Sequence, residues 1–175
     1  MRSANLPRPM AEPVRLLLVC LGNICRSPMA EGALRARLRE AGLDHRVSVD
    51  SVGTGNWHVG DPPDPRAIAT AARHGVDISG LRARQLCAAD FADFDGLLCA
   101  DPDNLREVRA LAPAGTRAEM SLLLEWAGQG SMAVPDPYTG GDADFEQVWA
   151  MVDRAALAVV ERLRQGTTKH RRIDA

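Results

Sequence analysis

Residues 14–28 read VRLLLVCLGNICRSP, and this stretch carries the pattern of a strand, a short loop and the start of a helix. Residues 14–19 form a short and mostly apolar run, which is typical of a parallel strand that is covered on both faces. Ser27 followed by Pro28 is the pattern of a helix N-cap with proline in the first turn. The stretch therefore predicts a strand that passes through residues 20–27 into a helix.

The rest of the chain repeats this alternation of strand-like and helix-like segments. Further strands are expected at residues 46–52, 95–99 and 116–120, and helices at residues 28–41, 65–74, 103–111, 122–127 and 144–164. The alternation favours one α/β domain with a short parallel sheet of about four strands and helices on both faces. In such sheets ligands bind beyond the carboxyl ends of the strands, which is where residues 20–27 must lie.

Length and composition limit the class of protein. The 175 residues suit one domain, and 46% apolar with 25% charged residues is ordinary for a globular chain. We expect the domain to span residues 13–166, between a flexible arm at 1–12 and a flexible tail at 167–175. A formal net charge of −2 argues against nucleic acid as a partner. No apolar run approaches the ~20 residues that span a membrane.

The number and spacing of the cysteines limit what the thiols can do. Four cysteines are too few for a disulfide scaffold, and none of them form the CxxC pattern of a zinc site. No metal and no cofactor are therefore expected. The chain is assigned to a reducing cytoplasm, where a cysteine in the right surroundings is a candidate nucleophile.

The loop at residues 20–27 has the composition of an anion-binding nest. Its backbone N–H groups can converge on one point, and the following helix adds unpaired N–H groups and the positive end of its dipole. Gly22 permits backbone angles that other residues resist. Arg26 offers a planar fork that matches two oxygens of a phosphoryl group, and the same donors would stabilise a thiolate at Cys20. No Gly-Lys-Ser/Thr closes the loop, which excludes a nucleotide-binding P-loop.

A thiolate that attacks phosphorus requires an acid for the leaving group. Asp136 lies between Pro135 and Pro137, which stiffen its approach. Its carboxyl group could protonate the departing oxygen and then act as a base on water. That Asp136 lies near Cys20 is an assumption of this interpretation, because the sequence alone does not bring the two residues together.

These residues together resemble the low-molecular-weight protein tyrosine phosphatases, over roughly residues 14–164. The likeness is carried by CLGNICRSPMAE at residues 20–31, SVGT at 51–54, DPRA at 64–67 and DPY at 136–138. The stretch GTGNWHVG at residues 53–60 is similar to bacterial members. The resemblance implies a phosphocysteine intermediate on Cys20, with Arg26 clamping the phosphoryl group and Asp136 as general acid and base. It also implies a tyrosine-phosphorylated protein as the substrate, and we expect a monomer.

The resemblance assigns supporting roles around the nucleophile. Ser27 would donate a hydrogen bond to the Cys20 sulfur. Asn23 would hold the strained shape of the loop through a network with Ser51 and His74. The other residues of the phosphate-binding loop are Leu21, Gly22, Ile24 and Cys25.

Two further expectations concern the substrate and oxidation. Trp57 and Tyr138 would line the walls between which a flat substrate ring enters. Cys25 would trap Cys20 as a reversible disulfide under oxidation, as a resolving thiol does beside a reactive thiolate.

Three other functions compete with this interpretation. Phosphoarginine phosphatases of the same fold tend to carry threonine where Ile24 stands, and the bulky apolar Ile24 suits an aromatic ring better. A thiol arsenate reductase needs two further cysteines, and although Cys99 resembles the place of the first, Arg106 stands where the second is expected. A phosphoprotein-binding module with a dead site would have lost the nucleophile, the arginine or the acid, and all three are present.

Overall fold

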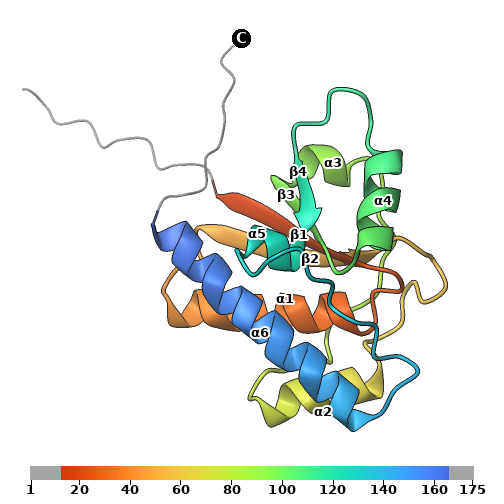
Figure 1. The fold of residues 1–175 in the computed structure, drawn as a ribbon, viewed down its shortest axis with the longest axis vertical. Coiled ribbons are helices and arrows are strands. Elements are labelled where there is room, and N and C mark those ends of the chain that lie inside the picture. The colour runs from red at the N-terminus through yellow and green to blue at the C-terminus, as the bar shows by residue number, and fades with distance from the viewer. Residues whose placement is uncertain (1–12, 166–175) are drawn as a thin grey trace, which may run out of the picture.

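Four parallel strands form the sheet, in the order β2-β1-β3-β4 (Figure 1). The strands are β1 (Val14–Cys20), β2 (Val47–Gly53), β3 (Gly96–Cys99) and β4 (Glu119–Leu122). The structure is a computed structural model, and it describes residues 13–165. The flexible segments predicted at residues 1–12 and 167–175 lie outside the described residues. The predicted parallel sheet of four strands is confirmed.

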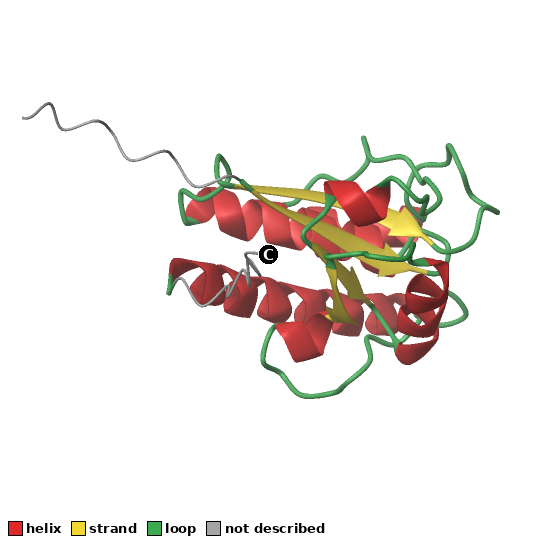
Figure 2. Cartoon of the chain, turned by 90° about the horizontal axis from the view of Figure 1, so that it is seen from above, coloured by secondary structure: helices red, strands yellow, loops and turns green. Residues whose placement is uncertain are grey.

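Helices cover both faces of this sheet, as Figure 2 shows from above. They are α1 (Arg26–Glu40), α2 (Pro65–Arg73), α3 (Asp90–Asp93), α4 (Pro102–Leu111), α5 (Leu123–Trp126) and α6 (Asp142–Arg164). The long helices α1 and α6 lie side by side on one face, and α3 and α4 lie on the other (Figure 1). The sheet is therefore the middle of three layers.

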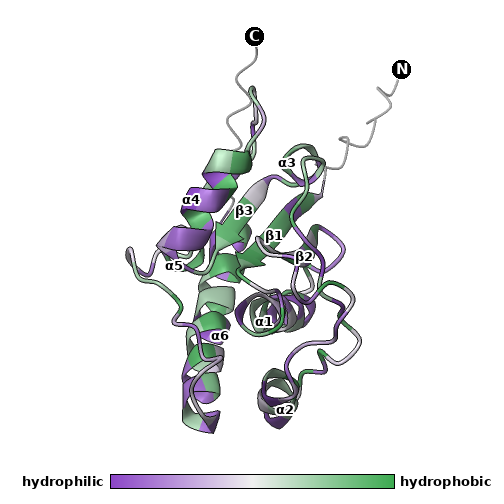
Figure 3. Cartoon of the chain, turned by 90° about the vertical axis from the view of Figure 1, so that its right-hand side faces the viewer, coloured by the Kyte–Doolittle hydropathy of each residue, from purple (hydrophilic) through white to green (hydrophobic). Residues whose placement is uncertain are grey.

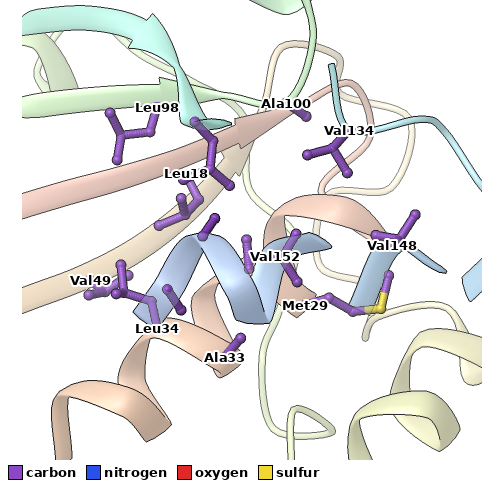
Figure 4. Close-up of a cluster of buried hydrophobic side chains, with 14 of the residues drawn as sticks. Leu18, Met29, Ala33, Leu34, Val49, Leu98, Ala100, Val134, Val148 and Val152 are labelled. Carbon is purple, nitrogen blue, oxygen red and sulfur yellow. The ribbon is translucent and has the colours of Figure 1, made fainter. Parts of the chain in front are cut away.

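The central strand β1 divides its side chains between two cores because successive residues of a strand point to opposite faces. Leu16 and Leu18 pack against α1 and α6, whereas Leu17 and Val19 pack against α3 and α4. Figure 4 shows the first core, where Leu18 meets side chains of α1 and α6. Cys20, the last residue of β1, belongs to the same core. The packing of β1 thus fixes the direction in which the chain leaves the sheet after Cys20.

Surface helices have one apolar and one polar side, which Figure 3 shows for α4 and α6. In α6 the buried side includes Phe145, Val148, Val152 and Val159. Such a stripe is what a helix needs in order to pack on a sheet. Within residues 13–165, no helix combines the length and the apolar character that a membrane crossing requires.

The start of α1 differs from the prediction. The helix begins at Arg26 with Cys25 in the N-cap position, and Ser27 is not the cap. Pro28 therefore occupies the third helical position, where a missing N–H is tolerated because the first-turn N–H groups have no helical partner. The Ser27 hydroxyl therefore does not cap α1, and it bonds instead to the Cys20 sulfur and the Asn23 amide.

Two other expectations were shifted or incomplete. The fourth strand was predicted at residues 116–120 and lies at Glu119–Leu122. The short helix α3 was not predicted, because its four residues are too few to show a helical period.

Gly53 ends β2 at a point where the backbone of the Cys20 loop, which we define as residues 20–27, passes very close. A Cβ on Gly53 would lie 2.7 Å from the Leu21 carbonyl oxygen and 3.1 Å from the Asn23 nitrogen. Both are backbone atoms and cannot rotate away. We expect Gly53→Ala to lower the free energy of unfolding by about 1–3 kcal/mol, measured by urea denaturation.

Gly80→Ala is the matched control, because a Cβ on Gly80 meets nothing within 4 Å. The two variants add the same methyl group and differ only in the space around it. A Gly53→Ala protein as stable as Gly80→Ala would contradict the close approach.

Candidate active site

The candidate site lies where the carboxyl end of β1 passes into the N-terminus of α1. Cys20 is the last residue of β1 and Arg26 is the first residue of α1. Both are buried, as are Asn23 and Ser27 between or beside them. The loop is thus buried at both ends, and it leads into the positive end of a helix dipole.

The Cys20 sulfur has two hydrogen-bonding partners. Its Sγ lies 2.9 Å from the Ser27 Oγ, and the backbone N–H of Asn23 donates to it over 3.3 Å. Hydrogen-bond donors and a helix N-terminus both stabilise negative charge on a neighbouring atom. The surroundings of Cys20 therefore suit a nucleophilic sulfur.

Asn23 holds the loop in shape. Its φ of 56° lies in the left-handed region, and among the non-glycine residues that the structure describes it alone has a positive φ. Its Nδ2 donates to the Ser27 Oγ over 2.8 Å and to the Ser51 Oγ over 2.9 Å. Its Oδ1 accepts from the backbone N–H of Arg84 over 3.0 Å. Three separate segments therefore stabilise the strained residue.

The network continues from Ser51 to a residue that the sequence analysis did not single out. The Ser51 hydroxyl donates to the Glu31 Oε2 over 2.7 Å, and the Arg35 Nη2 lies 2.7 Å from the Glu31 Oε1. Burial raises the pKa of the Glu31 carboxyl, and the Ser51 hydrogen bond and Arg35 oppose that rise. A glutamate on the apolar side of α1, in register with Leu34 and Leu38, is the signal that could have revealed it.

The predicted place of His74 in this network is wrong. The His74 Nε2 lies 2.8 Å from the Glu146 Oε2, and its ring stacks on Trp149 at 5.3 Å between centroids. Because His74 follows the last turn of α2, its ring points toward α6 rather than toward the Cys20 loop. The Arg84 backbone and Glu31 are the partners that complete the network.

Arg26 is held from two sides. Its Nη1 donates to the Asp101 Oδ2 over 2.6 Å and to the Val134 carbonyl over 3.1 Å. Its side chain is 4% exposed. The guanidinium therefore has a fixed orientation, and an anion bound over the loop would meet a prepared fork.

Asp101, which orients Arg26, is a second site residue that the sequence did not reveal. Its Oδ1 accepts from the backbone N–H of Asn104, so one carboxylate caps α4 and orients Arg26. An aspartate followed by proline, two residues after the buried strand β3, was the available signal, because carboxyl ends of parallel strands meet at one edge.

Asp136 is brought to the Cys20 loop from a distant part of the chain. It lies in the Asp136 loop, which we define as residues 134–141, between α5 and α6. Its Oδ2 is 3.7 Å from the Arg26 Nη2, and its Oδ1 accepts from the Tyr138 N–H over 3.1 Å. The side chain is 48% exposed, so it can exchange protons with a ligand or with water. The assumed proximity to the loop is thus met in the structure.

Exposed apolar side chains surround this edge of the molecule. Trp57 is 70% exposed, Tyr138 51% and Leu21 41%. The Trp57 ring covers Gly55, where a Cβ would lie 1.9 Å from the ring, and the Gly55 N–H donates to the Leu21 carbonyl. Large exposed aromatic side chains beside a polar site are typical of a surface that receives a ligand ring.

Two further cysteines, Cys25 and Cys99, are buried. Burial raises the pKa of the Cys25 thiol above its ordinary value, and the charges of Asp64 and Cys20 add to the rise. Cys99 packs on the α4 side of the sheet, and burial raises the pKa of its thiol to about 12. Both thiols are therefore neutral near pH 7. Among residues 13–165, no group of three or more His, Cys, Asp or Glu side chains could hold a metal ion.

Comparison with known proteins gives consistent matches over nearly the whole chain. Residues 15–169 match the family model of "Low molecular weight phosphotyrosine protein phosphatase". A protein of that description from Schizosaccharomyces pombe is 45% identical over 138 residues, which cover 78% of this chain and 88% of the relative.

Solved structures give the same result. A protein tyrosine phosphatase from Entamoeba histolytica, crystallised with Hepes in its active site, matches with a TM-score of 0.82 and 30% identity. The match covers 88% of this chain and 99% of that one. An arginine phosphatase from Drosophila matches with a TM-score of 0.78 and 29% identity, over 89% and 98% of the two chains.

Proposed function

The chain belongs to the low molecular weight phosphotyrosine protein phosphatase family and is a protein-tyrosine-phosphatase, and we propose that it hydrolyses phosphotyrosine in proteins through a phosphocysteine on Cys20. One observation carries the proposal. The buried Cys20 and Arg26 bracket one loop at a helix N-terminus, and Asp136 lies 3.7 Å from that arginine. A nucleophile, an anion clamp and an acid are thus gathered around one position.

In the first step the Cys20 thiolate attacks phosphorus. An S–P bond forms as the bond from phosphorus to the tyrosyl oxygen breaks, and the leaving oxygen keeps the electron pair. It takes a proton from the Asp136 carboxyl. The N–H groups of the Cys20 loop and the Arg26 fork stabilise the charge on the equatorial phosphoryl oxygens.

In the second step water attacks the same phosphorus. Asp136, now a carboxylate, accepts a proton from the water as the new P–O bond forms. The S–P bond breaks, the sulfur leaves as a thiolate, and inorganic phosphate is released. The Ser27 hydroxyl donates to that sulfur and stabilises it as a leaving group, in keeping with their 2.9 Å separation. Trp57 and Tyr138 would receive the substrate ring.

Asp136→Ala tests the acid. We expect kcat/KM for phenyl phosphate, whose leaving group is poor, to fall by about 10²- to 10⁴-fold. The fall for 4-nitrophenyl phosphate should be much smaller, because its leaving group departs without a proton. Steady-state kinetics with both esters measures the difference. Asp142→Ala, an exposed change at the start of α6, is the control. Equal losses on the two esters would remove Asp136 from this role.

Phosphoarginine is the second candidate substrate, because an arginine phosphatase is among the structural matches. We favour phosphotyrosine because the bulky Ile24 fills the loop where a smaller polar residue would leave room for a guanidinium. Phosphate release from matched phosphotyrosine and phosphoarginine peptides, with Cys20→Ser as the blank, decides between them. Faster release from phosphoarginine would overturn the substrate and leave the mechanism intact, and no release from either would overturn both.

A thiol arsenate reductase has little support in the arrangement of thiols. Cys99 is fully buried on the α4 side of the sheet, and its pKa is raised to about 12. Arg106, where a second cysteine is needed, is exposed on α4 and pairs with Asp103. No route for passing a disulfide outward exists along these residues.

Reversible oxidation of Cys20 stays a prediction. A peroxide would convert the Cys20 thiolate to a sulfenic acid, and attack by the Cys25 sulfur would release water and form a disulfide. In a reducing cytoplasm, which is the proposed compartment, thiols would restore the enzyme.

A further inference from the structure

Arg66 joins the two loops that hold the proposed reactive groups. It is the second residue of α2, directly after the cap residue Asp64 and Pro65. Figure 1 places α2 beside the N-terminal end of α6, which follows the Asp136 loop. The Arg66 side chain can therefore reach from one loop region to the other.

On one side, Arg66 contacts the backbone of the Asp136 loop. Its Nη2 donates to the Tyr138 carbonyl over 3.0 Å, and its Nη1 donates to the Gly140 carbonyl over 3.1 Å. These carbonyls lie two and four residues after Asp136. The other end of the loop is held at Val134, whose N–H donates to the Ala100 carbonyl and whose carbonyl accepts from Arg26. Asp136 is thus fixed from both sides.

On the other side, Arg66 is tied to the Cys20 loop through Asp64. The Arg66 Nε donates to the Asp64 Oδ1 over 3.0 Å, and its Nη2 donates to the Asp64 Oδ2 over 2.9 Å. The Asp64 N–H donates to the Ile24 carbonyl over 2.8 Å. The Arg66 hydrogen bonds also keep the pKa of the Asp64 carboxyl below its ordinary value.

Aromatic rings fix the plane of the guanidinium. The Arg66 Cζ lies 4.6 Å from the centroid of the Phe145 ring and 5.8 Å from that of Tyr138. A planar, delocalised cation stacks in this way, whereas an ammonium does not match the same set of acceptors. Because the Arg66 side chain is 35% exposed, its ion pair alone contributes little to stability. The arrangement therefore matters because it fixes the position of the guanidinium between the two loops.

We propose that Arg66 is a positioning residue that sets the place of Asp136 relative to Cys20. The inference rests on the proposed function, because it requires Asp136 to be the general acid. Arg66 touches no reacting atom. It acts by fixing two carbonyls of the Asp136 loop to a carboxylate whose backbone is fixed to the Cys20 loop.

Arg66→Met tests the proposal, because methionine keeps an apolar stem and removes every donor. A displacement of the acid by about 1 Å can lower rates by ~10²-fold, so we expect kcat/KM for phenyl phosphate to fall by about 10- to 100-fold. The fall for 4-nitrophenyl phosphate should be within about threefold. Arg66→Lys restores the charge without the fork, and it should recover only part of the loss.

The double variant Arg66→Met/Asp136→Ala separates positioning from general damage. If Arg66 acts through Asp136, removing it from the Asp136→Ala protein should change kcat/KM for phenyl phosphate by no more than about twofold. A loss that persists at full size in the double variant would overturn the proposal. So would equal losses of Arg66→Met on the two esters.

The matched control is Arg73→Met on the same helix. Arg73 pairs with Glu146 of α6 and has no hydrogen bond to the Asp136 loop. A cooperative urea unfolding transition shows that each variant is folded. If Arg66→Met does not fold, the two esters are compared with Arg66→Lys instead.

The outcomes also distinguish this inference from the proposed function. If Asp136→Ala lowers kcat/KM equally for the two esters, Asp136 is not the general acid, and the role of Arg66 is overturned with it. If Asp136→Ala lowers kcat/KM mainly for phenyl phosphate but Arg66→Met lowers it equally for both esters, only the role of Arg66 is overturned.

Discussion

Cys20→Ser should lose at least about 10⁴-fold in kcat/KM on any phosphate ester, because a serine hydroxyl cannot replace the thiolate in this site. The hydroxyl is far less acidic, and the donors around position 20 suit a charged sulfur. Phosphate release from a phosphotyrosine peptide measures the loss. Cys87→Ser is the control, since Cys87 is exposed and its backbone N–H pairs with Asp90, outside the Cys20 loop.

The same variant should keep the binding part of the site. Asn23 holds the shape of the Cys20 loop, and in the proposed mechanism backbone N–H groups and Arg26 would bind the phosphate. We therefore expect Cys20→Ser to bind a phosphotyrosine peptide in calorimetry without turning it over. Residual turnover within about tenfold of the wild type would show that the reaction does not pass through this sulfur.

Arg26→Lys should lower kcat/KM by about 10³-fold although the positive charge is retained. A lysine cannot donate to Asp101, to the Val134 carbonyl and to two phosphoryl oxygens together. The loss should be larger in kcat than in KM, because the fork matches the transition-state oxygens better than those of the ground state.

Arg82→Lys serves as the control for Arg26→Lys. Arg82 is exposed and donates only to carbonyls of its own segment, so lysine there should leave the rate unchanged. If Arg26→Lys stays within tenfold of the wild type, charge alone carries phosphate binding and the fork has no special role.

The fold could be predicted from the sequence because its strongest signals are local. The apolar run before Cys20 marks the central strand, and Asp64-Pro65 marks the start of α2, where the structure shows Asp64 capping the helix. Ser27-Pro28 carried the same kind of signal and misled, because the Ser27 hydroxyl bonds to Cys20 and Asn23 instead of capping α1. A cap and a site residue use the same side-chain chemistry, and only tertiary contacts separate them.

The parts of the site that the sequence did not reveal are those formed by distant pairs. Asp101 orients Arg26 across a gap of many residues, and Glu31 bonds to Ser51 from the neighbouring element. The local pattern around Glu31 or Asp101 marks one residue at most, and only the folded chain brings its partner within reach. His74 shows the converse, because a histidine in a plausible position along the chain points to Glu146 once α2 is docked on α6.

The left-handed backbone of Asn23 has a consequence for how the protein acquires activity. Its amide is held by Ser27 of α1, by Ser51 of β2 and by the backbone of Arg84. A chain that has formed β1 and α1 but has not yet docked β2 and Arg84 has all the residues of the Cys20 loop, but not the hydrogen bonds that hold Asn23 in its left-handed conformation. We therefore expect a newly made or refolding chain to gain activity only when the last of these segments has docked.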